Sequence, residues 1–117
     1  MHGLKPEISF FVIESTRETI DKTLEFYKTL GFEFEKEDHK PCGEHYSSDS
    51  GGVTLEIYIA QFVLKKKPPI GIKYENLNEV VHNVDERYHG RCQLVNGRRV
   101  VKLLDPDGRL VVLEDKK

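Results

Sequence analysis

Residues 8–35, ISFFVIESTRETIDKTLEFYKTLGFEFE, set out a strand, a helix and a second strand. The β-branched and aromatic run Ile8–Ile13 is typical of a buried strand. Apolar side chains then recur at helical spacing between residues 20 and 30, and Gly31 follows in the place of a helix C-cap. The alternation of apolar and charged residues over Phe32–Glu35 predicts a half-buried strand.

Two polar residues predict where this helix begins. Ser15 is followed three residues later by Glu18. This is the spacing of a capping box, in which the serine hydroxyl and the glutamate each accept a hydrogen bond from one backbone amide left over at the helix start. We therefore expect the helix to span about residues 16–30.

Turn residues divide the rest of the chain into further short elements. In the first half they predict strands at 44–48 and 53–59. In the second half, beyond the proline-stiffened segment 65–69, they predict a strand at 70–74 and a helix at 77–88 that is capped by Asn76. Three strands follow, at 93–95, 100–104 and 110–113. Asn96–Gly97 and Asp105–Gly108 are strong hairpin turn signals between the last three strands.

The two halves therefore repeat one order of elements, which predicts an α+β fold built from two βαβββ modules. The expected boundaries are residues 7–60 for module one, 61–69 for a linker and 70–115 for module two. The whole chain, residues 1–117 at 13.6 kDa, is long enough for one domain with its own core.

Composition excludes several classes of function. Eighteen basic and twenty acidic residues give a net charge of −2, which argues against a nucleic-acid partner and against an anionic membrane surface. The sequence has no apolar run of the roughly 18 residues that a membrane span needs, and no secretory signal at its start. Cys42 and Cys92 are too few for a disulfide scaffold, so we expect a reduced, cytoplasmic protein.

Three passages resemble the glyoxalase/bleomycin resistance/extradiol dioxygenase family, also called the vicinal oxygen chelate family. They are TLEFYKTLGFEFEKE at 23–37, GGVTLEIYI at 51–59 and VKLLDPDGRLVVLE at 101–114. The resemblance covers nearly the whole chain. It implies two modules side by side, whose sheets form a curved, open cup with the helices on the outside. It also implies a small molecule or a metal inside the cup, and a homodimer.

Metal-using members of that family carry four ligands, one from the first and one from the last strand of each module. Carried over to this sequence, these positions fall on Glu7, Glu56, Pro69 and Val112. Pro69 and Val112 have no side-chain donor, whereas a catalytic metal needs about three protein ligands. We therefore expect neither a metal nor another cofactor. Glu114, two residues further along the same strand face, is the one residue that could replace Val112.

Alternation along the strands extends the inner face of the cup. It places Ser9, Phe11, Thr54 and Tyr58 there with the two glutamates, and turns Phe10 and Val12 toward the helices. Two carboxylates in a partly dry cup repel each other, so we expect a compensating cation beside them, either Lys73 or a cationic ligand. The candidate ligand-binding residues are Glu7, Ser9, Phe11, Thr54, Glu56, Tyr58, Lys73 and Val112.

The expected function is therefore a metal-free protein that holds a small organic ligand, one that a cationic group would suit. The alternative is a metal-dependent lyase, isomerase or dioxygenase with a rearranged site, in which Glu7, Glu56 and Glu114 join a histidine. Whether the chain is an enzyme stays open. The run His39-Lys40-Pro41-Cys42-Gly43-Glu44-His45 has ligand-like spacing, but it lacks a second knuckle and is better interpreted as a hairpin loop.

Overall fold

The structure is a computed structural model that describes residues 4, 6–39, 43–84, 86–95 and 98–116. The predicted turn at Asn96–Gly97 and the cysteine of the histidine-rich run, Cys42, lie outside these residues. Neither prediction is therefore tested by the structure.

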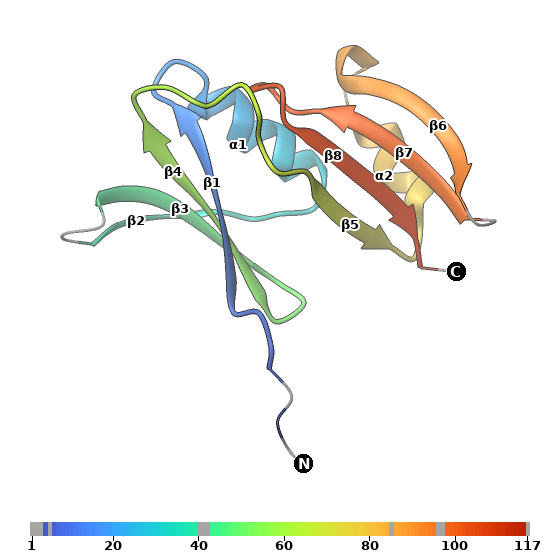
Figure 1. The fold of residues 1–117 in the computed structure, drawn as a ribbon, viewed down its shortest axis with the longest axis horizontal. Helices are drawn as coiled ribbons and strands as arrows, with labels where there is room; N and C mark the ends of the chain where they lie inside the picture. The colour runs from blue at the N-terminus through green and yellow to red at the C-terminus, as the bar shows by residue number, and fades with distance from the viewer. Residues whose placement is uncertain (1–3, 5, 40–42, 85, 96–97, 117) are drawn as a thin grey trace.

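Each half of the chain folds as a βαβββ module, as the repeated pattern predicted (Figure 1). Module one consists of β1 (Phe10–Thr16), α1 (Ile20–Thr29), β2 (Glu35–His39), β3 (Gly43–Ser50) and β4 (Val53–Ala60). Module two consists of β5 (Ile70–Tyr74), α2 (Leu77–Asn83), a 3-10 turn (Glu86–Tyr88), β6 (His89–Val95), β7 (Arg98–Leu104) and β8 (Leu110–Asp115). The α+β fold class is thus confirmed.

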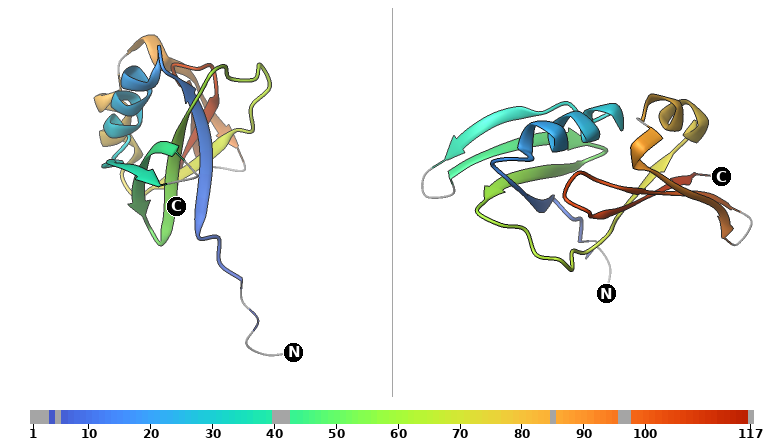
Figure 2. Two further views of the ribbon diagram at one scale, coloured as in Figure 1. Left: turned by 90° about the vertical axis from the view of Figure 1, so that its left-hand side faces the viewer. Right: turned by 90° about the horizontal axis from the view of Figure 1, so that it is seen from above.

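The two four-stranded sheets have matching topologies. Their strand orders are β1-β4-β3-β2 and β5-β8-β7-β6, and in each sheet the first strand runs parallel to the last while the other pairs are antiparallel. Both helices cover the same side of the molecule, so the opposite faces of the curved sheets are open (Figure 2). The buried apolar side chains under the helices form one core that both modules share.

The start of α1 differs from the prediction. The helix begins at Ile20, and its N-cap residue Thr19 makes no side-chain cap hydrogen bond. Ser15 lies in β1, where its buried hydroxyl contacts Asp107 of module two at 2.7 Å. The capping box is therefore wrong, because the serine serves a contact between modules that local spacing does not encode. The cap predicted at Asn76 is confirmed, since its side chain accepts from the Glu79 amide at 3.3 Å.

Two further boundaries moved for reasons of packing. β2 begins at Glu35 rather than at Phe32, because Phe32 and Phe34 leave the sheet and pack against the core. The ring of Phe32 meets Tyr27 edge-on at 6.2 Å between centroids. In module two, α2 ends at Asn83 instead of continuing through Tyr88. The rest of that predicted helix is a separate 3-10 turn.

A buried polar contact joins the modules, and we call it the interlock. It links the β7–β8 turn to β1 and α1, and consists of Asp105, Asp107 and Arg109 with Ser15, Thr19, Thr23 and Tyr27. Asp105 accepts from the Tyr27 hydroxyl at 2.6 Å and from the Arg109 guanidinium at 2.8 Å. Gly108 turns the chain with a φ of 84°, which favours glycine.

Asp107 completes the interlock from the second module. Its carboxylate accepts from the Thr19 hydroxyl at 2.7 Å and the Thr23 hydroxyl at 3.1 Å, besides its contact with Ser15. A carboxylate at a helix N-terminus also interacts favourably with the positive end of the helix dipole. Module two thus stabilises the start of the helix of module one.

Among the residues that the structure describes, no helix has both the length and the apolar character needed to cross a membrane.

Candidate functional site

The open face of the module-one sheet is fixed by the register of β1 against β4. Phe10 pairs with Thr54, Val12 with Glu56 and Glu14 with Tyr58. Side chains that are directly opposite on neighbouring strands share a face. The buried Ile13 lies on the other face, toward the helices. Phe10, Val12 and Glu14 therefore share the open face with Glu56 and Tyr58.

The face predicted for β1 was wrong by one residue. Phe11 pairs with Leu55 and thus lies on the helix side, whereas Phe10 and Val12 are on the open face and are 56% and 43% exposed. The face was assigned by counting back from Ser15, but the face is set by the register of β1 against β4, which that count does not determine. For Thr54, Glu56 and Tyr58 the register agrees with the predicted face.

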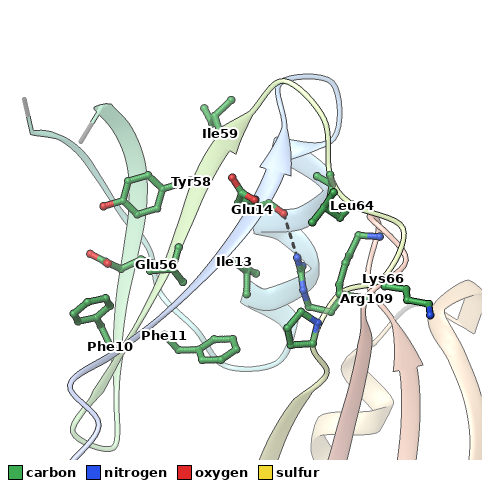
Figure 3. A pocket seen from close by; sticks show the side chains of 14 residues that line it. Phe10, Phe11, Ile13, Glu14, Glu56, Tyr58, Ile59, Leu64, Lys66 and Arg109 are labelled. Atoms are coloured by element: carbon green, nitrogen blue, oxygen red, sulfur yellow. Dashed lines mark hydrogen bonds between the residues drawn. The ribbon is translucent and has the colours of Figure 1, made fainter. Parts of the chain in front are cut away.

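A cavity of about 530 Å³ lies along β1, the edge strand of this sheet, and residues of the linker line its far side. Phe10, Glu56 and Tyr58 project to one side of the β1–β4 pair, and Phe11 projects to the other (Figure 3). Glu14 and Glu56 bring two carboxylates to this β1 cavity. Its linker wall is formed by Val63, Leu64, Lys66, Lys67 and Pro68.

Arg109 also borders the β1 cavity, but its charge is already engaged. Its side chain is only 4% exposed and its guanidinium bonds to the Asp105 carboxylate at 2.8 Å. A second guanidinium nitrogen donates to the Glu14 carbonyl at 3.4 Å (Figure 3). The arginine therefore ties the rim of the cavity to the interlock.

A histidine and two glutamates meet on the open face beside this cavity. The His45 Nε2 atom lies 3.1 Å from a carboxylate oxygen of Glu37 and 3.7 Å from one of Glu56. His45 is 2% exposed, and its ring stacks on Tyr58 at 4.3 Å between centroids with 11° between planes. The three side chains come from β2, β3 and β4, and we call them the Glu–His–Glu cluster.

Beyond the cluster, the open face is acidic. A hollow of about 550 Å³ is lined by Glu33, Glu35, Glu37, Asp49 and Glu56, together with Phe34, Ser47 and Thr54. Glu56 borders both this acidic hollow and the β1 cavity, so it lies between them. The Thr54 hydroxyl donates to Asp49 at 2.6 Å.

The structure brings together only some of the predicted site residues. Phe11, Glu56 and Tyr58 line the β1 cavity, and Thr54 joins Glu56 in the acidic hollow. Lys73 instead lines a separate cavity of about 360 Å³ between β1 and β5. Lys73 lines neither of the two cavities that Glu56 borders, so the expected compensation of the Glu56 charge by Lys73 is not seen there.

Glu7 and Ser9 precede β1 and are exposed. The register pairs Glu56 with Val12, five residues after Glu7. At about 3.3 Å per residue in a strand, that separation is roughly 16 Å along the chain. The expected meeting of Glu7 and Glu56 is thus wrong. Ser9 contributes its carbonyl, which accepts from the Thr54 amide at 2.9 Å.

The positions where family members bind a metal do not suit one here. Val112 pairs with Gly71 and Lys102, and Glu114 pairs with Lys73 and Val100, all on the module-two sheet. Pro69 is exposed and offers no donor. In module one, the β1 residue beside Glu56 is the apolar Val12. Of the residues predicted as metal ligands, Glu56 is therefore the one whose carboxylate lies on the open face of module one.

Sequence reasoning missed three residues of the site: Glu14, Glu37 and His45. The alternating charges of Glu35 and Glu37 gave a signal, since both had to lie on one face of a strand. His45 was set aside as part of a hairpin loop, and residues 39 and 43 do close the β2–β3 hairpin. Only the pairing of three strands reveals that Glu37, His45 and Glu56 converge.

Comparison with known proteins identifies the fold. No model of a known protein family matches this sequence, and neither does any curated protein sequence. Solved structures do match. A member of the glyoxalase/bleomycin resistance protein/dioxygenase superfamily from Sphaerobacter thermophilus superposes with a TM-score of 0.72 at 19% identity, over 97% of this chain and 99% of that one.

Two further matches carry names that describe a role. The bleomycin resistance determinant encoded on transposon Tn5 gives a TM-score of 0.71 at 18% identity, over 96% of this chain and 99% of that one. TnmS3, an antibiotic binding protein from Streptomyces sp. CB03234, gives 0.69 at 16% identity, over 99% and 100%. At these identities the likeness establishes the fold, as the resemblance had predicted.

Proposed function

We propose that this chain, which has the glyoxalase/bleomycin resistance/dioxygenase fold, binds a small organic molecule with a cationic group. The β1 cavity carries this proposal. Its volume of about 530 Å³ lies within the range of small-molecule sites, and it combines apolar walls with a few polar groups. The resistance and antibiotic-binding roles named for two similar structures support the same class of function.

The cationic character of the ligand is argued from the side chains around the cavity. Glu14 and Glu56 supply two carboxylates, and Phe10 and Tyr58 supply aromatic surface beside them. Carboxylates with aromatic rings are the groups that recognise organic cations. Lys66 and Lys67 lie on the linker wall, so we place the cationic end of the ligand against the β1–β4 wall.

The ligand is bound by side chains directly, without a metal at the four positions that metal-using family members employ. This part of the proposal rests on Pro69 and Val112, which have no donor at two of the positions that the resemblance assigns to ligands, and on Val12, the apolar residue that pairs with Glu56. The alternative function, a metal-dependent lyase, isomerase or dioxygenase, requires a different set of ligands. The Glu–His–Glu cluster is the one observation that favours that alternative.

We also propose a homodimer. Apolar side chains crowd the cavity mouth and the adjoining linker: Phe10 is 56% exposed, Phe62 70% and Leu64 64%. Ile8, just before β1, is 72% exposed. Exposed apolar side chains next to an edge strand are typical of a protein interface. A second copy of the chain would cover it and deepen the cavity.

The binding proposal is tested by a thermal-shift screen followed by calorimetry. The screen contains bleomycin, aromatic amidines and polyamine conjugates, with neutral and anionic analogues of each. We expect cationic compounds to bind, and Glu14→Gln and Glu56→Gln to weaken that binding at least tenfold, which is about 1.4 kcal/mol each. Added salt should weaken binding as well.

The matched control is Glu75→Gln, since the Glu75 side chain is 83% exposed and far in the sequence from both strands of the cavity. It should bind like the wild type. Hits confined to neutral or anionic compounds, or no hits at all, would contradict the cationic class. Equal losses in Glu75→Gln and Glu56→Gln would remove the cavity as the site.

A further inference from the structure

We infer that Glu37, His45 and Glu56 form a binding site for a divalent transition-metal ion. This inference goes beyond the proposed function, because it concerns the side of Glu56 that faces the acidic hollow rather than the β1 cavity. One ligand atom from each of the three residues lies within 4.8 Å of the others. The set differs from the positions used by metal-using family members and shares only Glu56 with them.

The orientation of the His45 ring is the first argument. Its Nδ1 atom lies 3.0 Å from the Gly43 carbonyl oxygen, which can only accept a hydrogen bond. Nδ1 therefore carries a proton, and in the neutral ring the lone pair is on Nε2. A backbone carbonyl on the far nitrogen is also the usual arrangement that orients a metal-binding histidine.

The surroundings of Nε2 are the second argument. This nitrogen faces carboxylate oxygens of Glu37 at 3.1 Å and Glu56 at 3.7 Å. Three acceptors facing one another need a positive centre between them, either a proton on Nε2 or a metal ion. A divalent ion would bind both carboxylates and Nε2 at once, whereas a proton on Nε2 would bond mainly to the nearer carboxylate, that of Glu37.

The two distances from His45 Nε2 fit a metal with little movement. Zinc binds nitrogen and oxygen ligands at about 2.0–2.2 Å, which separates two ligands of a tetrahedral ion by about 3.4 Å. The two distances from Nε2, 3.1 and 3.7 Å, bracket that separation. The Glu37 and Glu56 side chains are 34% and 19% exposed, so an ion between them can reach solvent and take further ligands.

A buried hydroxyl beside the cluster is a further observation. Ser47 pairs with Glu56 on one side and Glu35 on the other, two residues after His45 in β3. Its hydroxyl oxygen is buried and has no hydrogen-bond partner among the described residues. Buried hydroxyls are almost always paired. A water that completes the coordination of the ion would supply the missing partner.

The donor set selects the class of ion. One imidazole nitrogen and two carboxylate oxygens suit Zn²⁺, Co²⁺ or Mn²⁺, whereas Mg²⁺ and Ca²⁺ prefer oxygen alone. Because the ligands must be deprotonated, binding should weaken as the pH falls. We therefore expect Zn²⁺ to bind more tightly than Mg²⁺ by a wide margin.

The test is calorimetry with ZnCl₂ on the full chain after treatment with a chelator, together with the visible absorption of a Co²⁺ complex. We expect one equivalent of Zn²⁺ and a Co²⁺ spectrum that indicates nitrogen ligation. Glu37→Gln and His45→Gln should each weaken Zn²⁺ binding by more than the roughly 10–100-fold that loss of an outer-shell partner causes. His45→Gln keeps the volume and a hydrogen-bonding group in the buried position, and circular dichroism checks that it folds.

Two controls separate this inference from the binding of an organic ligand. His82→Ala removes an exposed histidine on α2 and should leave Zn²⁺ binding unchanged. Glu14→Gln should impair the organic cation but not Zn²⁺, whereas Glu37→Gln, in the acidic hollow and outside the β1 cavity, should impair Zn²⁺ but not the organic cation. Less than stoichiometric Zn²⁺ in the wild type, or binding that survives in both Glu37→Gln and His45→Gln, would overturn the metal site.

Discussion

The interlock and the open face of module one treat polar groups in opposite ways. In the interlock, Asp105 and Arg109 are almost fully buried and bond to each other and to neighbours. On the open face, the carboxylates of Glu14 and Glu56 line a cavity, and the apolar Phe10 is left exposed. Both regions depend on β1, in which Ile13 and Ser15 are buried while Phe10, Val12 and Glu14 lie on the open face.

This difference separates what stabilises the fold from what is available for binding. A buried charge with a full set of partners is costly to disturb, because removing one partner leaves the other without compensation. Carboxylates gathered on an accessible face add little to stability and remain available to a cation. Substitutions in the interlock should therefore change stability, and those on the open face should change binding or assembly.

The largest expected effect is at Asp105. Asp105→Asn removes the charge that compensates buried Arg109 and weakens the acceptor of the Tyr27 hydroxyl. We expect the free energy of unfolding to fall by about 3–5 kcal/mol, measured by urea denaturation. The exposed Asp38→Asn on β2 is the matched control and should stay within about 0.5 kcal/mol of the wild type. Equal effects of the two substitutions would refute the energetic role of the interlock.

A smaller effect is expected at Tyr27. Tyr27→Phe removes one hydrogen bond to a charged acceptor, which should cost about 1.5 kcal/mol near neutral pH. Burial, and next the negative charge of Asp105, raise the pKa of Tyr27 well above its ordinary value of 10.0. The unfolded chain therefore loses this proton first, and stability that is complete below pH 10 is lost as the pH rises beyond it.

Urea denaturation at neutral and alkaline pH measures this dependence. The wild type should lose stability above pH 10 more steeply than Tyr27→Phe, so the difference between them should shrink there. Burial also raises the pKa of Tyr74, to about 12, and that contribution is common to both proteins. Parallel pH profiles would show that Tyr27 does not titrate differently in the folded and unfolded states.

The smallest effect on folding is expected on the open face. Phe10→Ser changes a side chain that is 56% exposed, so the stability of dilute protein should move by no more than about 0.5 kcal/mol. The same substitution should reduce the mass in solution from twice 13.6 kDa to a single chain, as measured by light scattering. A wild type that stays at 13.6 kDa at high concentration would contradict the dimer.

The sequence was sufficient for the fold because its signals were local. Hydrophobic periodicity, Gly31, Asn76 and the Asp105–Gly108 turn each specify nearby backbone, and together they yield the two modules. The start of α1 was missed because Ser15 bonds to a residue 92 positions away. No local pattern records such a contact.

The candidate site was harder to predict, since it depends on which strands pair and in what register. Counting back from the expected helix start did not give the register of β1 against β4, so Phe11 was assigned to the open face in place of Phe10, and Glu7 in place of the β1 residues beside Glu56. Within β4, alternation alone placed Glu56 and Tyr58 correctly. His45 joins them only through the pairing of β2, β3 and β4, which periodicity within one strand does not determine.

The position of Asp107 also has a consequence for biosynthesis. Asp107 lies 92 residues after Ser15, yet its carboxylate accepts from the Ser15 and Thr19 hydroxyls before and at the start of α1. During translation, module one leaves the ribosome long before this acceptor exists, although N-terminal units generally fold first. Until the β7–β8 turn has been synthesised, the hydroxyls before and at the start of α1 can bond only to one another or to water. The interlock must therefore form after most of the second module has been made.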